Sequence, residues 1–325
     1  MRPAFDTIAN DYDKSFTHTA LGRSMRERVW QILVDSGIGG FGDLNGSLPN
    51  PPITNSPHHQ FTTSPNPQAL ELNCGTGEDA IWLARQGWQV LATDVSAEMV
   101  EVARAKAAAQ LSESLQLSES SSAEKRLQFQ VCGFSEIGRF AGQQFDLVFS
   151  NFGGLNCASP EDLQKLSLDL QKLVAPGGVF IAVMMSRFCW QETLYFLLKG
   201  KPREAFRRWN RKPVNAHLDE KTIVPTWYYS PKEFARLFCT TDLEVRRAER
   251  EERRTWKSVV QRPAGFWLPP SYLSSFFEKH PRLLGFLNFL EKNLAPAWLA
   301  PASDHFLICF VEMSSPKPET QNQQP

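Results

Sequence analysis

The chain lacks an excess of charge of either sign, because 35 lysines and arginines balance 35 aspartates and glutamates over 325 residues. Nucleic-acid-binding proteins usually carry a basic excess or stripe, so we expect no nucleic-acid partner. A long hydrophobic run is also lacking: the apolar residues 179–185 fall far short of the roughly 20 residues that a membrane span needs. No apolar segment follows the first three residues, which argues against a secretory signal.

Closely spaced cysteines are lacking as well. The six cysteines lie far apart and form no Cys-x-x-Cys motif, which argues against a zinc ribbon or a dithiol redox site. Several stand inside apolar stretches, as buried thiols of intracellular proteins do. His58 and His59 have no other ligand residues clustered near them, so we expect no metal site. We therefore expect a globular, cytoplasmic protein.

Composition divides the chain into segments. Apolar residues recur at helical spacing from Phe5 to Phe16, so residues 1–35 are expected to form helices. Residues 36–68, rich in glycine, proline and small polar residues, are expected to be a flexible insertion, because they bury too little apolar surface to offset ordering entropy. The polar residues 314–325 are expected to be a disordered tail.

Between residues 69 and 185, strand-like and helix-like patterns alternate. Strands are expected at residues 69–72, 89–92, 127–131, 145–150 and 179–185. Helices are expected at residues 78–86, from the cap Ser96 to residue 109, and after the cap Ser159. A loose loop is expected at residues 111–124. This order predicts an α/β fold, in which a parallel sheet is covered by helices on both faces.

The alternation stops after residue 185. Residues 230–233 form a capping box for a helix with Phe234, Leu237 and Phe238 on one side. With strands expected at 243–247 and 304–313, residues 230–255 and 304–313 would complete the core sheet. The aromatic and apolar segments 186–229 and 256–303 are expected to form a lid over the carboxyl edge of the sheet, with an apolar pocket beneath it.

The most informative stretch is LELNCGTGEDA at residues 70–80, a strand followed by a glycine turn and the start of a helix. Gly75 and Gly77 let a ligand approach the backbone, and the helix behind them begins with free amide donors. Asp94 follows Gly75 by 19 residues, at the end of the next strand, where its carboxylate can accept both hydroxyls of a ribose. The combination predicts a nucleoside-bearing cofactor.

The charges around the turn discriminate between cofactors. Residues 75–80 fit the dinucleotide fingerprint G-x-G-x-x-A, which favours an NAD(P)-dependent oxidoreductase. However, Glu71 lies at the mouth of the turn, and Glu78 and Asp79 open the helix with no lysine or arginine near them in sequence. Carboxylates would repel a pyrophosphate and favour the cationic sulfonium and ammonium of S-adenosylmethionine. We therefore expect S-adenosylmethionine and keep the oxidoreductase as the alternative.

Five motifs together give the chain a resemblance to a known family: LELNCGTG at 70–77, ATDVSAEM at 92–99, FDLVFSN at 145–151, LVAPGG at 173–178 and FDTIANDYD at 5–13. Residues 69–185 resemble a class I S-adenosylmethionine-dependent methyltransferase, of the branch that includes ubiquinone/menaquinone C-methyltransferases and the biotin-synthesis O-methyltransferase. The resemblance implies a Rossmann-like doubly wound sheet of seven strands, mostly parallel with an antiparallel last strand, plus helical lid insertions. Residues 1–35 would cap the cofactor.

The resemblance also implies residue roles. Glu71, Gly75 and Gly77 would hold the methionine part of the cofactor, and Asp94 would bind its ribose. Further cofactor or substrate contacts would come from Tyr12 at the cofactor carboxylate, Val95 and Met99 near the adenine, and Asn151 and Phe152 at the methyl group and substrate.

Two positions depart from the family pattern. Asn73, within the cofactor-binding turn, stands where the family usually has glycine. Gly133 stands where an acid often binds the adenine amino group, so Phe134 is expected to stack on the adenine.

The acceptor and the catalytic base stay open at this stage. A sulfonium is already activated, so alignment of the acceptor and exclusion of water matter more than a fixed base. A structural role is expected for each side chain that could approach the acceptor, namely His217, Asp219, Tyr228, Tyr229 and His305. We predict a small, apolar acceptor methylated on oxygen, nitrogen or carbon, such as a quinone-like ring, a polyketide or a lipid-linked or carrier-bound acid. A catalytically silent methyltransferase-like binding protein is the remaining alternative.

Two further patterns concern partners. The basic residues between 199 and 212, beside the apolar residues 194–198, form either a solvated helix face or a contact with an acidic carrier, a phosphate-bearing substrate or an anionic membrane. Residues 283–290 would either belong to the core or dock on a membrane.

Overall fold

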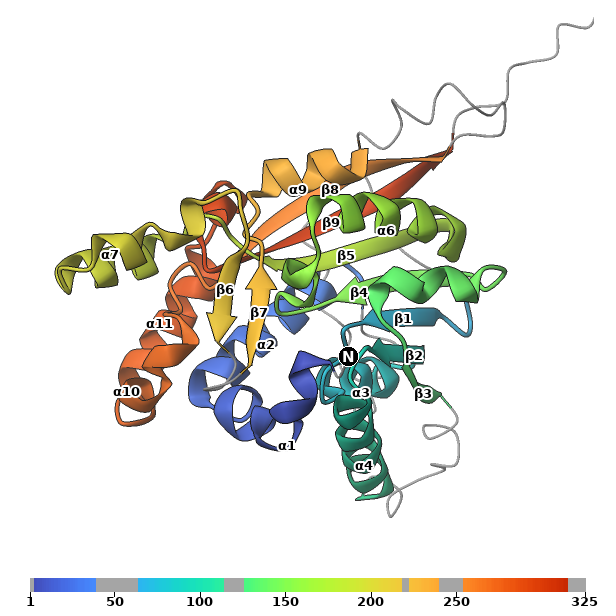
Figure 1. Ribbon diagram of the computed structural model, residues 1–325. Coiled ribbons are helices and arrows are strands. Elements are labelled where there is room, and N and C mark those ends of the chain that lie inside the picture. The colour runs from blue at the N-terminus through green and yellow to red at the C-terminus, as the bar shows by residue number, and fades with distance from the viewer. Residues whose placement is uncertain (1–2, 39–63, 114–125, 218–221, 240–253, 315–325) are drawn as a thin grey trace, which may run out of the picture.

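One seven-stranded sheet, in the order β3-β2-β1-β4-β5-β9-β8, organises the molecule. The computed structural model describes residues 3–38, 64–113, 126–217, 222–239 and 254–314. Helices cover both faces of the sheet (Figure 1). The α/β class predicted from the alternating pattern is confirmed. Most of the expected insertion, the strand expected at 243–247 and most of the expected tail lie outside the described residues.

The parallel part of the sheet contains the five strands that the sequence predicts. They are β1 (Gln68–Leu72), β2 (Gln89–Asp94), β3 (Leu127–Val131), β4 (Phe145–Ser150) and β5 (Val174–Met185). In the central strand, Leu70 pairs in register with Leu91 of β2 and Val148 of β4. The strand order reverses between β1 and β4, and ligands of such sheets bind at the carboxyl ends of the strands at this point.

Two buried clusters cover the two faces of the sheet. One joins the strands to α2 (Ala20–Asp35), α3 (Glu78–Arg85) and α4 (Ala97–Glu113), and the other joins them to α6 (Pro160–Leu173) and α9 (Pro231–Cys239). The expected cap of α4 is present, because the Ser96 hydroxyl accepts the Met99 amide at 3.1 Å. Helix α4 is longer than predicted: Leu111 is buried in the first cluster, so packing extends the helix into the segment expected to be a loop.

The last two strands complete the sheet. Strand β9 (His305–Ser314) runs antiparallel to β5 and to β8 (Arg254–Ala264), as the resemblance implied for the last strand. Residues 256–264, assigned to the lid from sequence, therefore belong to the sheet. Trp256 is buried there and its indole donates to the Ser167 carbonyl at 3.2 Å. The apolar composition of 256–303 as a whole concealed the strand period at its beginning.

The remaining elements gather at one end of the sheet, opposite α4 and β3 (Figure 1). We call the following set the lid: α7 (Trp190–Leu198), α8 (Pro202–Ala205), η6 (Arg207–Trp209), β6 (Val214–His217), β7 (Ile223–Thr226), η9 (Ser271–Leu273), α10 (Ser274–Glu278), α11 (Pro281–Asn293) and η10 (Ala297–Ala302). The N-terminal segment consists of η1 (Ala4–Thr7), α1 (Ala9–Tyr12) and η2 (Asp13–Thr17). In the described part of the chain, no helix is long and apolar enough to cross a bilayer.

Candidate functional site

The glycine turn after β1 has a backbone that only certain residues adopt. Asn73, Gly75 and Gly77 all have positive φ, at 56°, 52° and 78°. A Cβ on Gly77 would lie 2.9 Å from the Cβ of Ala103 and 2.9 Å from the ring of Phe129, so no larger residue fits. A Cβ on Gly75 would instead meet open space, which leaves the backbone of the turn accessible to a ligand.

Gly154, in the loop after β4, leaves room for Asn73, the residue that departs from the family pattern. A Cβ on Gly154 would lie only 2.5 Å from the Cβ of Asn73. The loop after β4 therefore leaves room for an asparagine in the turn after β1. The Ser150 hydroxyl also donates to the Asn73 side-chain oxygen, although at a long 3.4 Å.

Asp94 ends β2 beside the turn. Its two carboxylate oxygens each accept one backbone amide, from Gly75 at 2.9 Å and from Ser96 at 2.9 Å. Burial raises the pKa of Asp94 above its ordinary value, and the two amide hydrogen bonds counteract the rise. Because each carboxylate oxygen has a second lone pair, the fixed carboxylate can still accept ribose hydroxyls.

Glu71 is a buried carboxylate near the carboxyl end of β1, 1% exposed. Its Oε2 atom has no hydrogen-bond partner among the described residues. Burial, and then the charge of Asp79, raise the pKa of Glu71 well above its ordinary value. An unpaired buried carboxylate is costly, so the position is explained by a cationic or hydrogen-bond-donating ligand.

The arginine that lies near the turn in the described part of the chain is already paired with a carboxylate. Arg26 of α2 forms a buried ion pair with Asp79 at the start of α3. The same Asp79 carboxylate accepts the Trp30 indole at 2.7 Å and the Asn151 amide at 3.1 Å. Glu71, Asp79 and Asp94 thus place three buried carboxylates against one arginine. The turn favours a cation and disfavours a pyrophosphate.

The N-terminal segment is bound over this turn. The Asp13 carboxylate forms an ion pair with Lys106 at 2.6 Å and accepts the Thr76 hydroxyl at 2.6 Å. Burial would raise the pKa of Asp13, but these bonds outweigh it and hold the pKa below its ordinary value. Asp6 accepts the Ser96 hydroxyl at 2.5 Å, next to Asp94. Sequence reasoning missed Lys106 because its partners lie far away along the chain.

Tyr12 projects from this segment toward the carboxylates. Burial raises the pKa of Tyr12 to about 12, although the Arg26 guanidinium opposes the rise. The Tyr12 ring packs against Phe16, with centroids 5.9 Å apart. The structure thus brings Tyr12 to the site, where the resemblance had placed it.

The expected adenine side lies beyond β2. Val95 is exposed there, and a Cβ on Gly133 would touch it at 3.5 Å, while Met99 is buried beneath. Phe134 is half-buried and packs against the core cluster of α6 and α9. Val95 therefore offers an exposed apolar side chain beside Gly133, and adenine stacking on Phe134 stays a prediction.

Asn151 and Phe152 take different roles after β4. Both ends of the Asn151 amide are occupied, because it donates to Asp79 and accepts the Phe152 amide at 2.8 Å. Phe152 has a φ of 45°, and its ring lies 4.8 Å from the Arg26 guanidinium and 5.7 Å from the His305 ring. Asn151 therefore stabilises the turn, whereas Phe152 faces the neighbouring cavity.

A cavity of about 240 Å³ lies between the N-terminal segment and the lid. One wall is aromatic and apolar, formed by Tyr12, Phe16, Phe152 and Met185, and the other is largely polar, formed by Glu192, Arg207, Arg208, Tyr228, Ser271, Tyr272, Asp304 and His305. No leucine of the described residues is among the lining side chains. The pocket is therefore more polar than the apolar composition of the lid predicts.

Arg208 holds the polar wall together. It pairs with Glu192 of α7 at 2.6 Å and with Asp304, just before β9, at 2.7 Å. All three side chains are buried, and the guanidinium lies 5.0 Å from the centroid of the Tyr228 ring. Burial would raise the pKa of Asp304, but Arg208 and His305 hold it below its ordinary value. This cluster joins the lid to the sheet.

The structure narrows the candidates for a base. Tyr228 and His305 line the cavity, and His305 Nδ1 lies 3.1 Å from Asp304 Oδ2. Tyr229 instead donates to the Ala158 carbonyl at 2.8 Å, and His217 is exposed on β6. Asp219 lies outside the described residues. Only Tyr228 and His305 of the described candidates therefore lie where an acceptor would bind.

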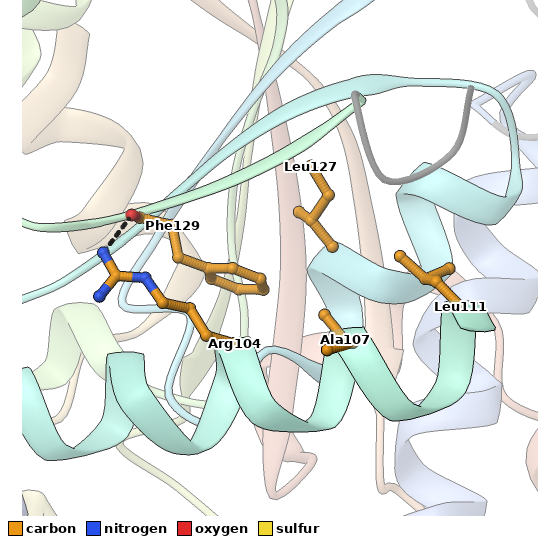
Figure 2. A pocket seen from close by; sticks show the side chains of 6 residues that line it. Arg104, Ala107, Leu111, Leu127 and Phe129 are labelled. Carbon is orange, nitrogen blue, oxygen red and sulfur yellow. Dashed lines mark hydrogen bonds between the residues drawn. The ribbon is translucent and has the colours of Figure 1, made fainter. Parts of the chain in front are cut away.

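A second cavity lies on the outer side of the sheet, between α4 and β3 (Figure 2). Its one charged lining side chain, Arg104, donates to the Phe129 carbonyl at 2.8 Å. The other lining residues are apolar, so this cavity offers no chemistry of its own.

Comparison with known proteins relates part of the chain to a known domain family. Residues 69–178 match the family model of a methyltransferase domain. This range of the chain contains the glycine turn, Asp94 and Phe152. The predicted resemblance to a methyltransferase is confirmed for this domain. The resemblance to the ubiquinone, menaquinone and biotin branch is not confirmed. No curated protein is significantly similar to the chain.

Several solved structures are similar to the chain at low identity. A DhpI–SAH complex is 13% identical over 96% of this chain and 94% of that chain, with a TM-score of 0.48. An S-adenosylmethionine-dependent methyltransferase from Clostridium acetobutylicum is 12% identical over 95% and 98%, with a TM-score of 0.48. A putative one from Listeria monocytogenes is 14% identical over 76% and 90%, with a TM-score of 0.46.

Proposed function

We propose that the chain is an S-adenosylmethionine-dependent methyltransferase that acts on a small acceptor. The observation that carries the proposal is the unpaired Glu71 carboxylate in a turn with a surplus of buried carboxylates. Such a turn fits the ammonium and sulfonium of this cofactor better than a pyrophosphate. The methyltransferase-domain match over residues 69–178 supports the same assignment.

The residues present fit the cofactor. Glu71 would hold the ammonium, Asp94 would hold the ribose, and Val95 would lie under the adenine. When bound, S-adenosylmethionine supplies a methyl group that its sulfonium has already activated. Tyr12 and the rest of the N-terminal segment cover the turn, so their role would be to exclude water from the methyl group.

The acceptor would bind in the cavity between Phe152 and the lid. Its aromatic wall suits a planar or apolar group, and its polar wall, with Arg208 and His305, suits an oxygen-bearing group. A quinone-like ring, a polyketide or a lipid-linked acid has both features. A place in the ubiquinone, menaquinone or biotin branch stays part of this proposal, as does a cytoplasmic location, which suits six free thiols.

Calorimetry with S-adenosylmethionine and NADH tests the proposal on the wild type and on Asp94→Ala. We expect S-adenosylmethionine to bind and the substitution to weaken it by about 10- to 100-fold, through loss of charge-assisted hydrogen bonds. Asp169→Ala, a change on α6 away from the turn, is the matched control and should bind like the wild type. Binding of NADH alone would favour the oxidoreductase, and binding of neither would favour the catalytically silent protein.

A further inference from the structure

The lid exposes apolar side chains that a core role does not explain. Among the described residues, every exposed leucine and phenylalanine lies between residues 194 and 294. We call the following set the docking face: Leu194, Leu197, Leu198, Tyr272, Phe276, Leu283, Phe286 and Phe289. Leu198 is 80% exposed, the largest fraction among these residues. Contiguous exposed apolar surface of this kind marks an interaction site.

The helices that carry the docking face are connected to one another. Tyr272 of η9 packs against Tyr195 of α7 with ring centroids 5.5 Å apart. Segment η9 leads directly into α10, and α10 packs against α11. Figure 1 shows α7, α10 and α11 at the same end of the molecule.

Helix α11 shows that this surface is additional to the core. The inner side of α11 is already packed. Leu284 belongs to a buried cluster that includes Leu21 and Met25 of α2, and Leu287 packs against this cluster. Phe286 and Phe289 point away from that cluster and are more than half exposed. An ordinary helix would present polar residues there.

The charges around the docking face have one predominant sign. Eight exposed cations lie on the same elements and their connections: Lys199, Lys201, Arg203, Arg211, Lys212, Lys279, Arg282 and Lys292. Within the described residues 190–212 and 271–293, the only exposed carboxylates are Glu204 and Glu278. The chain as a whole is neutral, so this excess is local.

We propose that the docking face binds the surface of an anionic phospholipid bilayer. Leucines and aromatic rings would enter the interface between headgroups and acyl chains, and the cations would contact the lipid phosphates. A second copy of the chain fits poorly, because a two-fold contact through this face would bring the same cations together. Tyr272 belongs both to this face and to the cavity, so a lipid-borne acceptor would have a short path inward.

Sedimentation with vesicles tests the proposal on the full chain. We expect the protein to sediment with vesicles of phosphatidylcholine and phosphatidylglycerol, much less with phosphatidylcholine alone, and to be released by high salt. Lys199→Glu with Lys201→Glu should weaken vesicle binding about tenfold or more, and Leu198→Glu by about tenfold.

Matched controls distinguish the effect of changing the docking face from the effect of changing charge or hydrophobicity elsewhere on the surface. Lys165→Glu with Lys172→Glu makes the same charge change on α6, and Val34→Glu alters an exposed apolar residue on α2. These controls should bind vesicles like the wild type. All variants should keep the melting temperature of the wild type.

Four results would overturn the proposal. The wild type could stay in the supernatant with anionic vesicles, or the face variants could bind as well as their controls. The third is a dimer, seen by sedimentation velocity, that Leu198→Glu dissociates while vesicle binding is absent. Binding of inorganic phosphate at the same strength as anionic vesicles would likewise contradict docking on a bilayer.

Discussion

The parallel strands and the lid differ in where their apolar side chains lie. Strands β1, β2, β4 and β5 bury nearly all of theirs, because helices cover both faces of the sheet. The lid helices are covered on one side, and their other side carries exposed leucines and phenylalanines. Apolar residues are therefore buried on every side of an element that is covered on both faces, but on only one side of a lid helix.

The two regions also treat buried charge differently. In the lid, Arg208 is matched by Glu192 and Asp304, so the cluster is internally satisfied. In the glycine turn, Arg26 is matched by Asp79, and Glu71 is left over. A satisfied cluster fixes structure, whereas an unsatisfied carboxylate at a strand end marks a place for a ligand.

Breaking the satisfied cluster should have the largest effect. Arg208→Met leaves the buried Asp304 without its arginine and leaves Glu192 with Arg207 alone, so it should lower the free energy of unfolding by about 3–5 kcal/mol. Urea denaturation measures the loss. Arg211→Met, a change at an exposed arginine nearby, should cost less than about 0.5 kcal/mol. Equal effects from the two substitutions would contradict the role given to Arg208.

The same cluster predicts a pH dependence. Arg208 and His305 hold the pKa of Asp304 below its ordinary value of 3.8, so Asp304 stabilises the fold above that pH. This contribution is lost as the pH falls through the pKa of the folded state. The difference in unfolding free energy between the wild type and Arg208→Met should therefore shrink as the pH falls below about 4.

A pair of leucine truncations measures the contrast between the regions directly. Leu70→Ala in β1, where the side chain is 0% exposed, should cost about 2–5 kcal/mol of unfolding free energy. Leu198→Ala in α7 should cost less than about 0.5 kcal/mol, because no buried contact is lost. Comparable losses in urea denaturation would mean that the exposed side of α7 is part of the folded core.

Gly77→Ala should have a smaller effect, confined to the turn. The new Cβ meets Ala103 and Phe129 at a positive φ, so we expect a loss of about 2 kcal/mol and weaker cofactor binding. Gly37→Ala is the matched control, because its φ is 83° and a Cβ there meets nothing within 4 Å. The control should lose only about 1 kcal/mol, and a loss as large as that of Gly77→Ala would exclude the clash as the cause.

The sequence predicts the structural features that depend on residues close together along the chain. Strands β3 and β4, the Ser96 cap and the glycine turn all follow from patterns within a few residues. The pairing of Arg26 with Asp79, across 53 positions, and of Arg208 with Asp304, across 96, could not be predicted, because nothing local specifies such partners. The sequence also does not predict that one apolar side of α11 is exposed, because apolar spacing alone does not indicate which sides of a helix are covered.

The most direct test of the account compares the wild type with Glu71→Gln by thermal unfolding, with and without S-adenosylmethionine. The pKa of Glu71 is raised, so its charge opposes folding at neutral pH, and glutamine should raise the stability of the ligand-free protein. The account predicts that S-adenosylmethionine stabilises the wild type and that Glu71→Gln removes most of this effect. Equal stabilisation of both proteins by S-adenosylmethionine would contradict the role of Glu71 at the centre of the site.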